Sequence, residues 1–216
     1  VDIRRASVAR DKKYRNDAAY GFINCTMNLS HKIFNPVAMK RGALNYYPVG
    51  TFTKTITLNE YKYLTSLGVE ITINKAYWLI IEKQLYPYRT AVEDLMYYKN
   101  KYKREGLKMQ YHTVKIILNS RYGKMVQLIK KDDKYKAGSS WNPIYASVIT
   151  ANCRIRVSEM QQKYDSVVAV HTDSIISTKP IEIITGNKLG EWEKSAEGRG
   201  IILGSGIYQI GSKSKF

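Results

Sequence analysis

The sequence predicts an α+β fold, in which an antiparallel β-sheet with packed helices carries an inserted α-helical hairpin. Three observations lead to this class. Apolar and polar residues alternate over residues 69–74, as in a strand with one buried face. A helical pattern over residues 88–122 is interrupted by Gly106, which is typical of a turn between antiparallel helices. A long helical pattern at residues 143–164 leads directly into two apolar strands.

The first half of the chain reads as strands, turns and one capped helix. Residues 18–29 are rich in β-branched and aromatic side chains, which favours a strand. Glycine and proline punctuate residues 31–52, so turns and short strands are expected there. Thr57 and Glu60 fit a capping box at the start of a helix, and Gly68 fits its C′ position.

The second half adds the helical hairpin, a long helix and two strand pairs. Residues 132–143 (DDKYKAGSSWNP) are expected to form a loop. Pro143 suits the first turn of the long helix. Residues 166–178 (SVVAVHTDSIIST) predict two strands around a tight turn, and residues 199–211 predict a final strand pair.

Composition narrows the classes of function. The chain has 216 residues and a net charge of +17, enough positive charge to attract a polyanion, either nucleic acid or an anionic membrane surface. No apolar run approaches the roughly 20 residues that cross a bilayer, and no secretory leader is recognisable. Cys25 and Cys153 lack metal-ligand spacing. We therefore expect reduced thiols in an intracellular protein with no membrane partner.

A cation, an amide and a phenol share one face of the helix that ends near residue 124. Lys115, Asn119 and Tyr122 are spaced i, i+4, i+7 and fall within an arc of about 60°. The lysine could hold a triphosphate, and Tyr122 beside Gly123 could offer a flat ring to a base or sugar. An ordinary solvated helix face explains the same pattern.

A second basic pair lies on the preceding helix. Lys99 and Lys103 are spaced i, i+4 and share a face. If the two helices pack antiparallel across Gly106, their basic faces can converge on one anion. The alternative is a lysine-rich solvated helix.

Asp173 stands between two apolar strands. A carboxylate there should be paired or should bind a cation, and Mg²⁺ in phosphoryl-transfer sites is held in this way. The alternative is a turn in which the aspartate makes a local side-chain hydrogen bond.

These segments together resemble the family B DNA polymerases. KIILNSRYG (115–123) resembles the K-x-x-x-N-S-x-Y-G motif of that family, and HTDS (171–174) is similar to its D-T-D-S motif. The segment between them, NPIYASVITANCRIRV (142–157), resembles the palm helix that links the two motifs. Their order and spacing make the match more specific than any one motif.

The resemblance spans residues 18–212. YYPVGTFTKTITLNEYKYL (46–64) resembles the segment before the fingers, especially in the protein-primed branch, and KLGEWE (188–193) resembles the strand after the second motif. The family implies a palm formed by residues 1–86 and 125–216, with helical fingers at 87–124. It also implies a DNA-directed DNA polymerase that uses dNTPs, primer–template DNA and two Mg²⁺ ions, or Mn²⁺. A terminal protein primer and a viral or plasmid source are typical of the protein-primed branch.

The resemblance assigns roles to the helical residues. Lys115 would contact the incoming triphosphate, and Asn119 and Tyr122 would line the nucleotide pocket. Tyr122 would lie near the sugar and help to exclude ribonucleotides. Lys99 and Lys103 match upstream fingers positions that reach the β- and γ-phosphates.

The hairpin residues take the remaining roles. Asp173 matches the aspartate that binds the catalytic metals, and Thr172 and Ser174 complete its turn. Ser120 and Gly123 belong to the first motif and support its shape. His171 stands where the family has another aspartate, so the site loses a negative charge; as Mg²⁺ prefers oxygen ligands, we do not expect the imidazole to bind it.

One family motif is missing from the sequence. The second metal-binding aspartate lies in a D-x-x-S-L-Y-P-type motif, which does not occur here. Asp2 is a weak substitute, and the motif is expected just before Val1. The exonuclease and thumb parts of the family also have no counterpart. We therefore expect a fragment that polymerises poorly alone.

Two other readings stay open. The chain could be a non-catalytic, nucleic-acid-binding remnant of a polymerase, in which His171 marks lost metal chemistry. It could also be a basic structural protein with coincidental motifs; triphosphate binding would then be absent.

Overall fold

The computed structural model describes residues 6–9, 18–42, 44–81, 86–204 and 206–215 and confirms the α+β class. The helices are α1 (Leu58–Ser66), α2 (Arg89–Arg104), α3 (Lys108–Lys124) and α4 (Pro143–Lys163). The strands of the first half are β1 (Ala6–Ala9), β2 (Tyr20–Leu29), β3 (Met39–Arg41), β4 (Leu44–Tyr46), β5 (Gly50–Thr57) and β6 (Glu70–Ile81). Those of the second half are β7 (Leu128–Lys131), β8 (Lys134–Ala137), β9 (Val167–His171), β10 (Ser174–Ser177), β11 (Gly200–Gly204), β12 (Ile207–Ile210) and β13 (Lys213–Lys215).

The largest sheet has the strand order β1-β6-β2-β5, and all of its pairings are antiparallel. Strand β2 lies inside it, and its side chains alternate between buried and less buried positions. The buried face packs Ile23, Met27 and Trp78 into the main core. Gly21 leaves room for this packing, because a Cβ at that position would lie 3.1 Å from the Trp78 ring. The strand predicted at residues 18–29 is confirmed as β2. The alternation predicted over residues 69–74 lies at the start of β6, where Ile71 and Ile73 pack against the same core.

Helix α1 covers this core and begins as the sequence predicted. The Thr57 side chain accepts a hydrogen bond from the Glu60 N–H, and the Glu60 carboxylate accepts from the Thr57 N–H. Gly68 follows the C-cap residue and has φ of +78°, a left-handed conformation that glycine adopts without strain. Both ends of α1 therefore match the expected signals.

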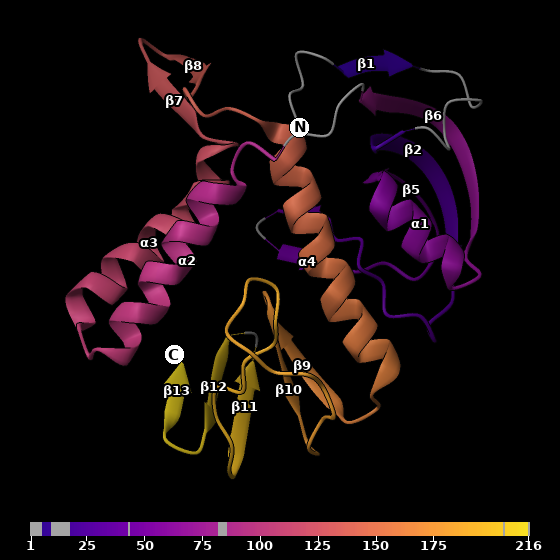
Figure 1. Ribbon diagram of the computed structural model, residues 1–216. Coiled ribbons are helices and arrows are strands. Elements are labelled where there is room, and N and C mark those ends of the chain that lie inside the picture. Colours follow the sequence, from indigo (N-terminus) through magenta and orange to yellow (C-terminus); the bar gives the residue numbers. More distant parts are fainter. Residues whose placement is uncertain (1–5, 10–17, 43, 82–85, 205, 216) are drawn as a thin grey trace.

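Helix α4 is the central support of the molecule. Figure 1 shows α4 running between the sheet with α1 on one side and the α2–α3 hairpin on the other, with β9 and β10 below it. It contacts α1, α3, β5, β9 and β10. The Asn142 side chain caps its start by accepting from the Tyr145 N–H, and Pro143 occupies the first turn.

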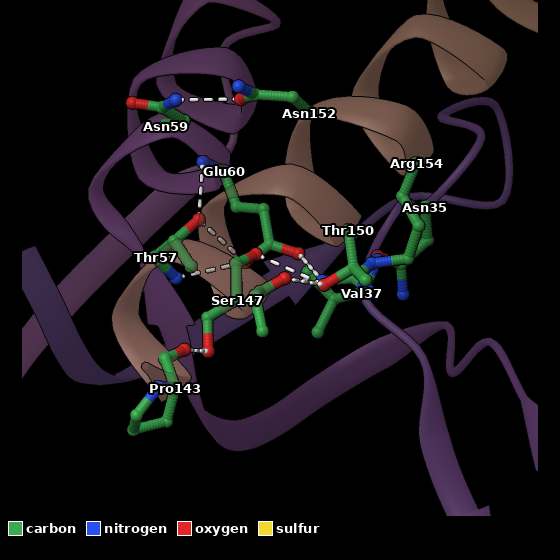
Figure 2. Close-up of polar contacts among 11 residues, drawn as sticks. Asn35, Val37, Thr57, Asn59, Glu60, Pro143, Ser147, Thr150, Asn152 and Arg154 are labelled. Carbon is green, nitrogen blue, oxygen red and sulfur yellow. Dashed lines mark hydrogen bonds and ion pairs between the residues drawn. The ribbon is translucent and has the colours of Figure 1, made fainter. Parts of the chain in front are cut away.

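A buried polar junction fastens α4 to α1. The Glu60 side chain is only 4% exposed, and one of its carboxylate oxygens accepts a hydrogen bond from the Arg154 guanidinium at 2.7 Å. The other oxygen accepts from both the N–H and the hydroxyl of Thr57. Figure 2 shows these contacts, together with a bond between the Asn59 and Asn152 amides. Since every partner lies on β5, α1 or α4, the junction fixes where α4 lies against the sheet.

Two segments differ from the expected pattern. Residues 132–143 were expected to form a loop, but residues 134–137 form β8, which pairs with β7. The turn between them is made by Asp132 and Asp133, whose φ angles are +50° and +58°. A two-residue turn of this kind needs positive φ at both positions, which aspartate tolerates better than most residues. The first residues of the predicted loop therefore form the turn of the β7–β8 hairpin.

The palm sheet expected from the sequence is divided into separate sheets. Among the strands that the structure describes, β9 and β10 form a two-stranded sheet, and β11, β12 and β13 form another. The predicted pair around residues 199–211 is confirmed as β11 and β12, and β13 adds an edge strand that the sequence pattern did not indicate. Among the described residues, no helix is both long and apolar enough to cross a membrane. Cys25 and Cys153 are free thiols, as expected.

Removing the arginine of the junction tests its importance. Arg154→Ala leaves the Glu60 carboxylate buried without its cation, and we expect a loss of about 3 kcal/mol in the free energy of unfolding. Urea denaturation followed by circular dichroism measures this change.

The double variant Glu60→Gln with Arg154→Ala is the matched control. It removes the buried charge as well and should regain part of the lost stability. Equal stability of the single and double variants would contradict the role given to the buried carboxylate.

Candidate nucleotide-binding site

The face of α3 predicted from helical spacing exists as a solvent-exposed strip. Lys115, Asn119 and Tyr122 lie on α3, and all three are exposed. The Lys115 ammonium lies 5.8 Å from the centre of the Tyr111 ring, one turn earlier. No atom lies within 4 Å of the place where a Gly123 side chain would begin. Ser120 bonds within its own helix, its hydroxyl donating to the Ile117 carbonyl at 3.1 Å.

The two helices of the hairpin bring their basic residues to one carboxylate. Helices α2 and α3 pack together across Gly106, whose φ is +70°. The Lys103 ammonium donates to the Glu193 carboxylate at 2.7 Å. Lys99 and Lys115 are near enough to affect the ionisation of the same carboxylate. The Lys103–Glu193 ion pair joins α2 to this carboxylate, and the charges of Lys99 and Lys115 also act on it. The convergence of the basic faces on a bound anion stays a prediction.

The lysines stabilise the ionised form of Glu193. The hydrogen bond from Lys103 lowers the pKa of the Glu193 carboxyl, and the charges of Lys103, Lys99 and Lys115 act in the same direction. The same hydrogen bond raises the pKa of Lys103. Because the Glu193 pKa is lowered, its contribution is present at neutral pH and is lost as the pH falls through that lowered value. Both side chains are more than half exposed, so the pair contributes little stability, about 0–1 kcal/mol.

Glu193 lies in a loop and not in a strand. Residues 188–193 were expected to resemble a strand, but the only bridge recorded for this part of the described chain joins Thr185 and Trp192. The guanidinium carbon of Arg156, on α4, lies 5.8 Å from the centre of the Trp192 ring. Gly190, with φ of +87°, passes so close to Arg156 that a Cβ would lie 3.0 Å from its guanidinium nitrogen. The loop is therefore held by its contacts with α4 rather than by strand pairing, and in this position Glu193 reaches Lys103.

Asp173 lies at the tip of the β9–β10 hairpin. His171 and Ser174 face each other in the ladder, so Thr172 and Asp173 form a two-residue turn. Thr172 has φ of +59°, which is rare for a β-branched residue, and the Ser174 hydroxyl donates to the His171 carbonyl at 2.9 Å. The Asp173 side chain is exposed. It lies near α4, because its charge raises the pKa of Cys153, although burial of the thiol is the larger cause.

His171 is buried and contacts Gly206 and Tyr208. Its Nδ1 accepts a hydrogen bond from the Gly206 N–H at 3.1 Å, and its ring stacks on Tyr208 with the centroids 4.8 Å apart. Since Nδ1 is the acceptor, Nε2 carries the proton of the neutral ring. No partner for the buried Nε2 is found among the described residues. His171 thus anchors the hairpin to the β11–β13 sheet.

The described residues do not by themselves complete a metal site. Magnesium takes oxygen ligands, and a two-metal centre needs carboxylates that hold both ions. Within the described ranges, no group of three or more His, Cys, Asp or Glu side chains could hold an ion. The Cys153 thiol, whose pKa is raised by burial and by the charge of Asp173, is a soft donor that does not suit Mg²⁺. Asp173 could give such a centre one carboxylate, and the other oxygen ligands would come from outside the described set.

Sequence reasoning missed the parts that complete the anion site. The KLGEWE segment was noted as a strand resemblance, yet Glu193 is the carboxylate that the lysines surround. Arg156 was not singled out, although it orders the loop through Trp192. A signal was present in the tryptophan–glutamate pair after Gly190, because an aromatic anchor next to an acid suits a docked loop.

Comparison with solved structures identifies the fold. The orthorhombic crystal form of phi29 DNA polymerase matches 97% of this chain and 43% of its own length, with a TM-score of 0.71 and 17% identity. Phi29 DNA polymerase complexed with primer-template DNA and incoming nucleotide substrates matches 94% of this chain, with a TM-score of 0.68. The chain has a DNA polymerase fold.

A further comparison gives the same fold. A further structure of phi29 DNA polymerase, complexed with primer-template DNA, gives a TM-score of 0.68 and 17% identity over 97% of this chain. The chain spans less than half the length of these polymerases, 41–43% in the three structures. No protein-family model and no curated protein matches the sequence.

The proximity of Asp173 and Cys153 gives a test of the site geometry. Asp173→Asn removes a negative charge that raises the Cys153 pKa, so more thiolate should form near pH 8.5. Alkylation of Cys153 by iodoacetamide, followed by mass spectrometry, should become about twofold faster.

Cys25 contributes little background to this measurement, because burial raises its pKa to about 11. Asp165→Asn, an exposed acid on the loop after α4, is the matched control and should leave the rate unchanged. Equal rates in the two variants would show that Asp173 does not face α4.

Proposed function

We propose that this chain forms the palm-and-fingers part of a family B DNA-directed DNA polymerase. In the intact protein the substrate is a dNTP, the partner is primer–template DNA, and the reaction transfers a nucleotidyl group to a primer 3′-hydroxyl. The single observation that carries the proposal is the ion pair between Lys103 and Glu193, a carboxylate on which the charges of Lys99 and Lys115 also act. These are the three lysines that the polymerase resemblance assigns to the triphosphate.

In this proposal, Glu193 occupies the place of a nucleotide phosphate. A carboxylate carries one negative charge, whereas a triphosphate carries several and offers more acceptor oxygens to lysine donors. The exposed Lys103–Glu193 pair contributes at most about 1 kcal/mol, so its loss is a small cost of ligand binding. In this proposal the triphosphate displaces Glu193 and binds Lys99, Lys103 and Lys115 in its place.

The remaining part of the nucleotide follows the face of α3. With its phosphates at Lys115, the sugar and base lie toward Asn119 and Tyr122, one and two turns further along the helix. The open space beside Gly123 lets a sugar lie flat against the Tyr122 ring. A ribose 2′-hydroxyl would meet that ring, which is the physical basis for excluding ribonucleotides.

Asp173 is the metal ligand of the proposal. Bound Mg²⁺ or Mn²⁺ would neutralise charge on the transferred phosphoryl group. The described residues supply one carboxylate for this purpose, so the proposal relies on further ligands for the second ion. Resemblance to the protein-primed branch extends the proposal to a terminal protein as primer.

A second function is favoured by one specific observation. His171 replaces an acid of the family motif and is committed to Gly206 and Tyr208, which leaves Asp173 as the only acid of its turn. A remnant that binds nucleic acid without catalysis would tolerate this loss of negative charge. The lysines would then hold phosphates of a DNA strand.

Two substitutions with opposite effects test the anion site. Lys115→Ala should weaken binding of a dNTP about tenfold, because a charge-assisted contact is lost. Glu193→Gln should strengthen binding about twofold, because the competing carboxylate charge is removed. Isothermal titration of the 216-residue chain with dTTP at low salt measures both.

Lys108→Ala and Glu105→Gln are the matched controls. Both residues are exposed and lie at the connection between the two helices, Glu105 as the C-cap of α2 and Lys108 as the first residue of α3. Each changes the net charge by the same amount as its test variant. If the controls alter affinity as much as the test variants do, binding depends on net charge and the site is wrong.

Primer extension tests the proposed reaction. We expect little extension by the 216-residue chain alone, and extension by a longer polypeptide that contains it should be abolished by Asp173→Ala. A radiolabelled primer annealed to a longer template, with Mg²⁺ or Mn²⁺ in parallel, measures the product.

Asp165→Ala serves as the control and should retain activity. Asp173-dependent extension by the chain alone would show that one described carboxylate suffices. A longer polypeptide that binds primer–template but never extends it would favour the non-catalytic function.

A further inference from the structure

Tyr111 lies on α3 beside lysines from both helices of the α2–α3 hairpin. It is half-buried in the first turn of α3, where its N–H donates to the Leu107 carbonyl at 3.0 Å. The Lys115 ammonium, one turn later on the same helix, lies 5.8 Å from the centre of its ring. Tyr111 precedes the motif that starts at Lys115, and the proposed function gives it no role.

Tyr111 also neighbours Lys103, which lies on α2. The pKa of Lys103 is raised by the hydrogen bond and the charge of Glu193, and Tyr111 adds the smallest contribution in the same direction. Helices α2 and α3 pack side by side (Figure 1), so a ring near the start of α3 can reach a side chain near the end of α2. One aromatic ring therefore has a lysine of each helix as its neighbour.

Lysines that share an anion need support of this kind. The four-carbon stem of lysine is flexible, so fixing its ammonium group costs conformational entropy. Two ammonium groups that approach one anion also repel each other. The face of an aromatic ring is negative and attracts a cation, yet it leaves the ammonium donors free for other acceptors. A ring beside Lys115 can therefore restrict that side chain while its charge stays open to a ligand.

The Tyr111 ring is itself restrained. The ring of His112 meets it edge to face, with the ring centres 5.4 Å apart and an angle of 71° between the planes. Tyrosine has only two side-chain torsions before its ring, so it loses less freedom than lysine when it is fixed. The ring thus provides a firmer reference position than either lysine has alone.

We propose that Tyr111 is a positioning residue that holds Lys115 at the spacing from Lys103 that a triphosphate needs. This inference rests on the proposed function, because it concerns the lysines of the same site. The ring attracts the Lys115 ammonium before the nucleotide arrives, and phosphate oxygens then accept from its free donors. A monophosphate is held by one lysine, whereas a triphosphate reaches lysines of both helices, so Tyr111 favours the longer phosphate chain.

Substitutions that keep the shape of the ring but change the charge of its face test this role. Tyr111→pentafluorophenylalanine reverses the quadrupole of the ring, whereas Tyr111→Phe keeps it. Isothermal titration of the 216-residue chain at low salt would compare dTTP with dTMP. We expect Tyr111→Phe to bind dTTP nearly as tightly as the parent chain. The fluorinated ring and Tyr111→Leu should each bind dTTP about threefold more weakly, with little change for dTMP.

Tyr98→Leu is the matched control, because it makes the same change in the same hairpin. Tyr98 is 44% exposed, and its ring contacts those of Tyr97 and Tyr102. This variant should leave the ratio of the dTTP and dTMP affinities unchanged. Circular dichroism would verify folding, and the fluorinated ring tests the same contact without removing the packing of Tyr111.

The position of Lys115 can also be measured without a nucleotide. Protons above the face of an aromatic ring are shifted upfield by its ring current. In a chain with isotope-labelled lysine, assigned with the help of Lys115→Arg, the ε-protons of Lys115 should therefore resonate upfield of those of exposed lysines. Tyr111→Leu should remove this shift, and Tyr111→Phe should keep it.

Two results would overturn the inference. One is the absence of an upfield shift for Lys115 in the parent chain. The other is equal dTTP affinity of the fluorinated and phenylalanine variants. Unchanged dTTP affinity in Lys115→Ala has a different meaning: it overturns the proposed function, while the shift of Lys115 still supports or refutes its contact with Tyr111.

Discussion

The buried contact between Glu60 and Arg154 is the constraint on which the rest of the structure depends. A carboxylate that is only 4% exposed needs hydrogen-bond partners, and Thr57 on β5 and Arg154 on α4 supply them. The start of α1 and the middle of α4 therefore cannot shift independently. Two other residues of α4 link this junction to the candidate site. The charge of Asp173 acts on the Cys153 thiol, and the Arg156 guanidinium lies over the Trp192 ring.

The functional region is assembled from segments that are distant in sequence, and charge explains why. Three lysines close together repel one another, so a fold that gathers them needs a counter-charge. The loop after β10 provides it with Glu193, and the same loop is held to α4 by the Arg156–Trp192 contact and to α2 by Asn100. Because the counter-charge comes from a loop and is more than half exposed, it neutralises the lysines without sealing them from a ligand.

Local signals predicted the helices well and the long-range contacts poorly. The capping box of Thr57 and Glu60 and the break at Gly106 depend on a few neighbouring residues, so spacing alone revealed them. The β7–β8 hairpin was missed, because its turn uses aspartates in a conformation more typical of glycine. Glu193 could not be found from sequence spacing, since it is 90 residues from Lys103 and only the packing of a loop on α4 brings them together.

The substitution at His171 changes the balance between cation and anion binding. A carboxylate at this position would place a second negative charge beside Asp173. The imidazole still offers an acceptor to the Gly206 N–H and a ring to Tyr208, so the hairpin keeps its anchor while its turn holds only one acid. Attraction for a divalent cation at the turn is therefore weaker, whereas Lys99, Lys103 and Lys115 share only the charge of Glu193. Among the described residues, the charges of three lysines thus act on one carboxylate, while the turn at Asp173 holds one acid.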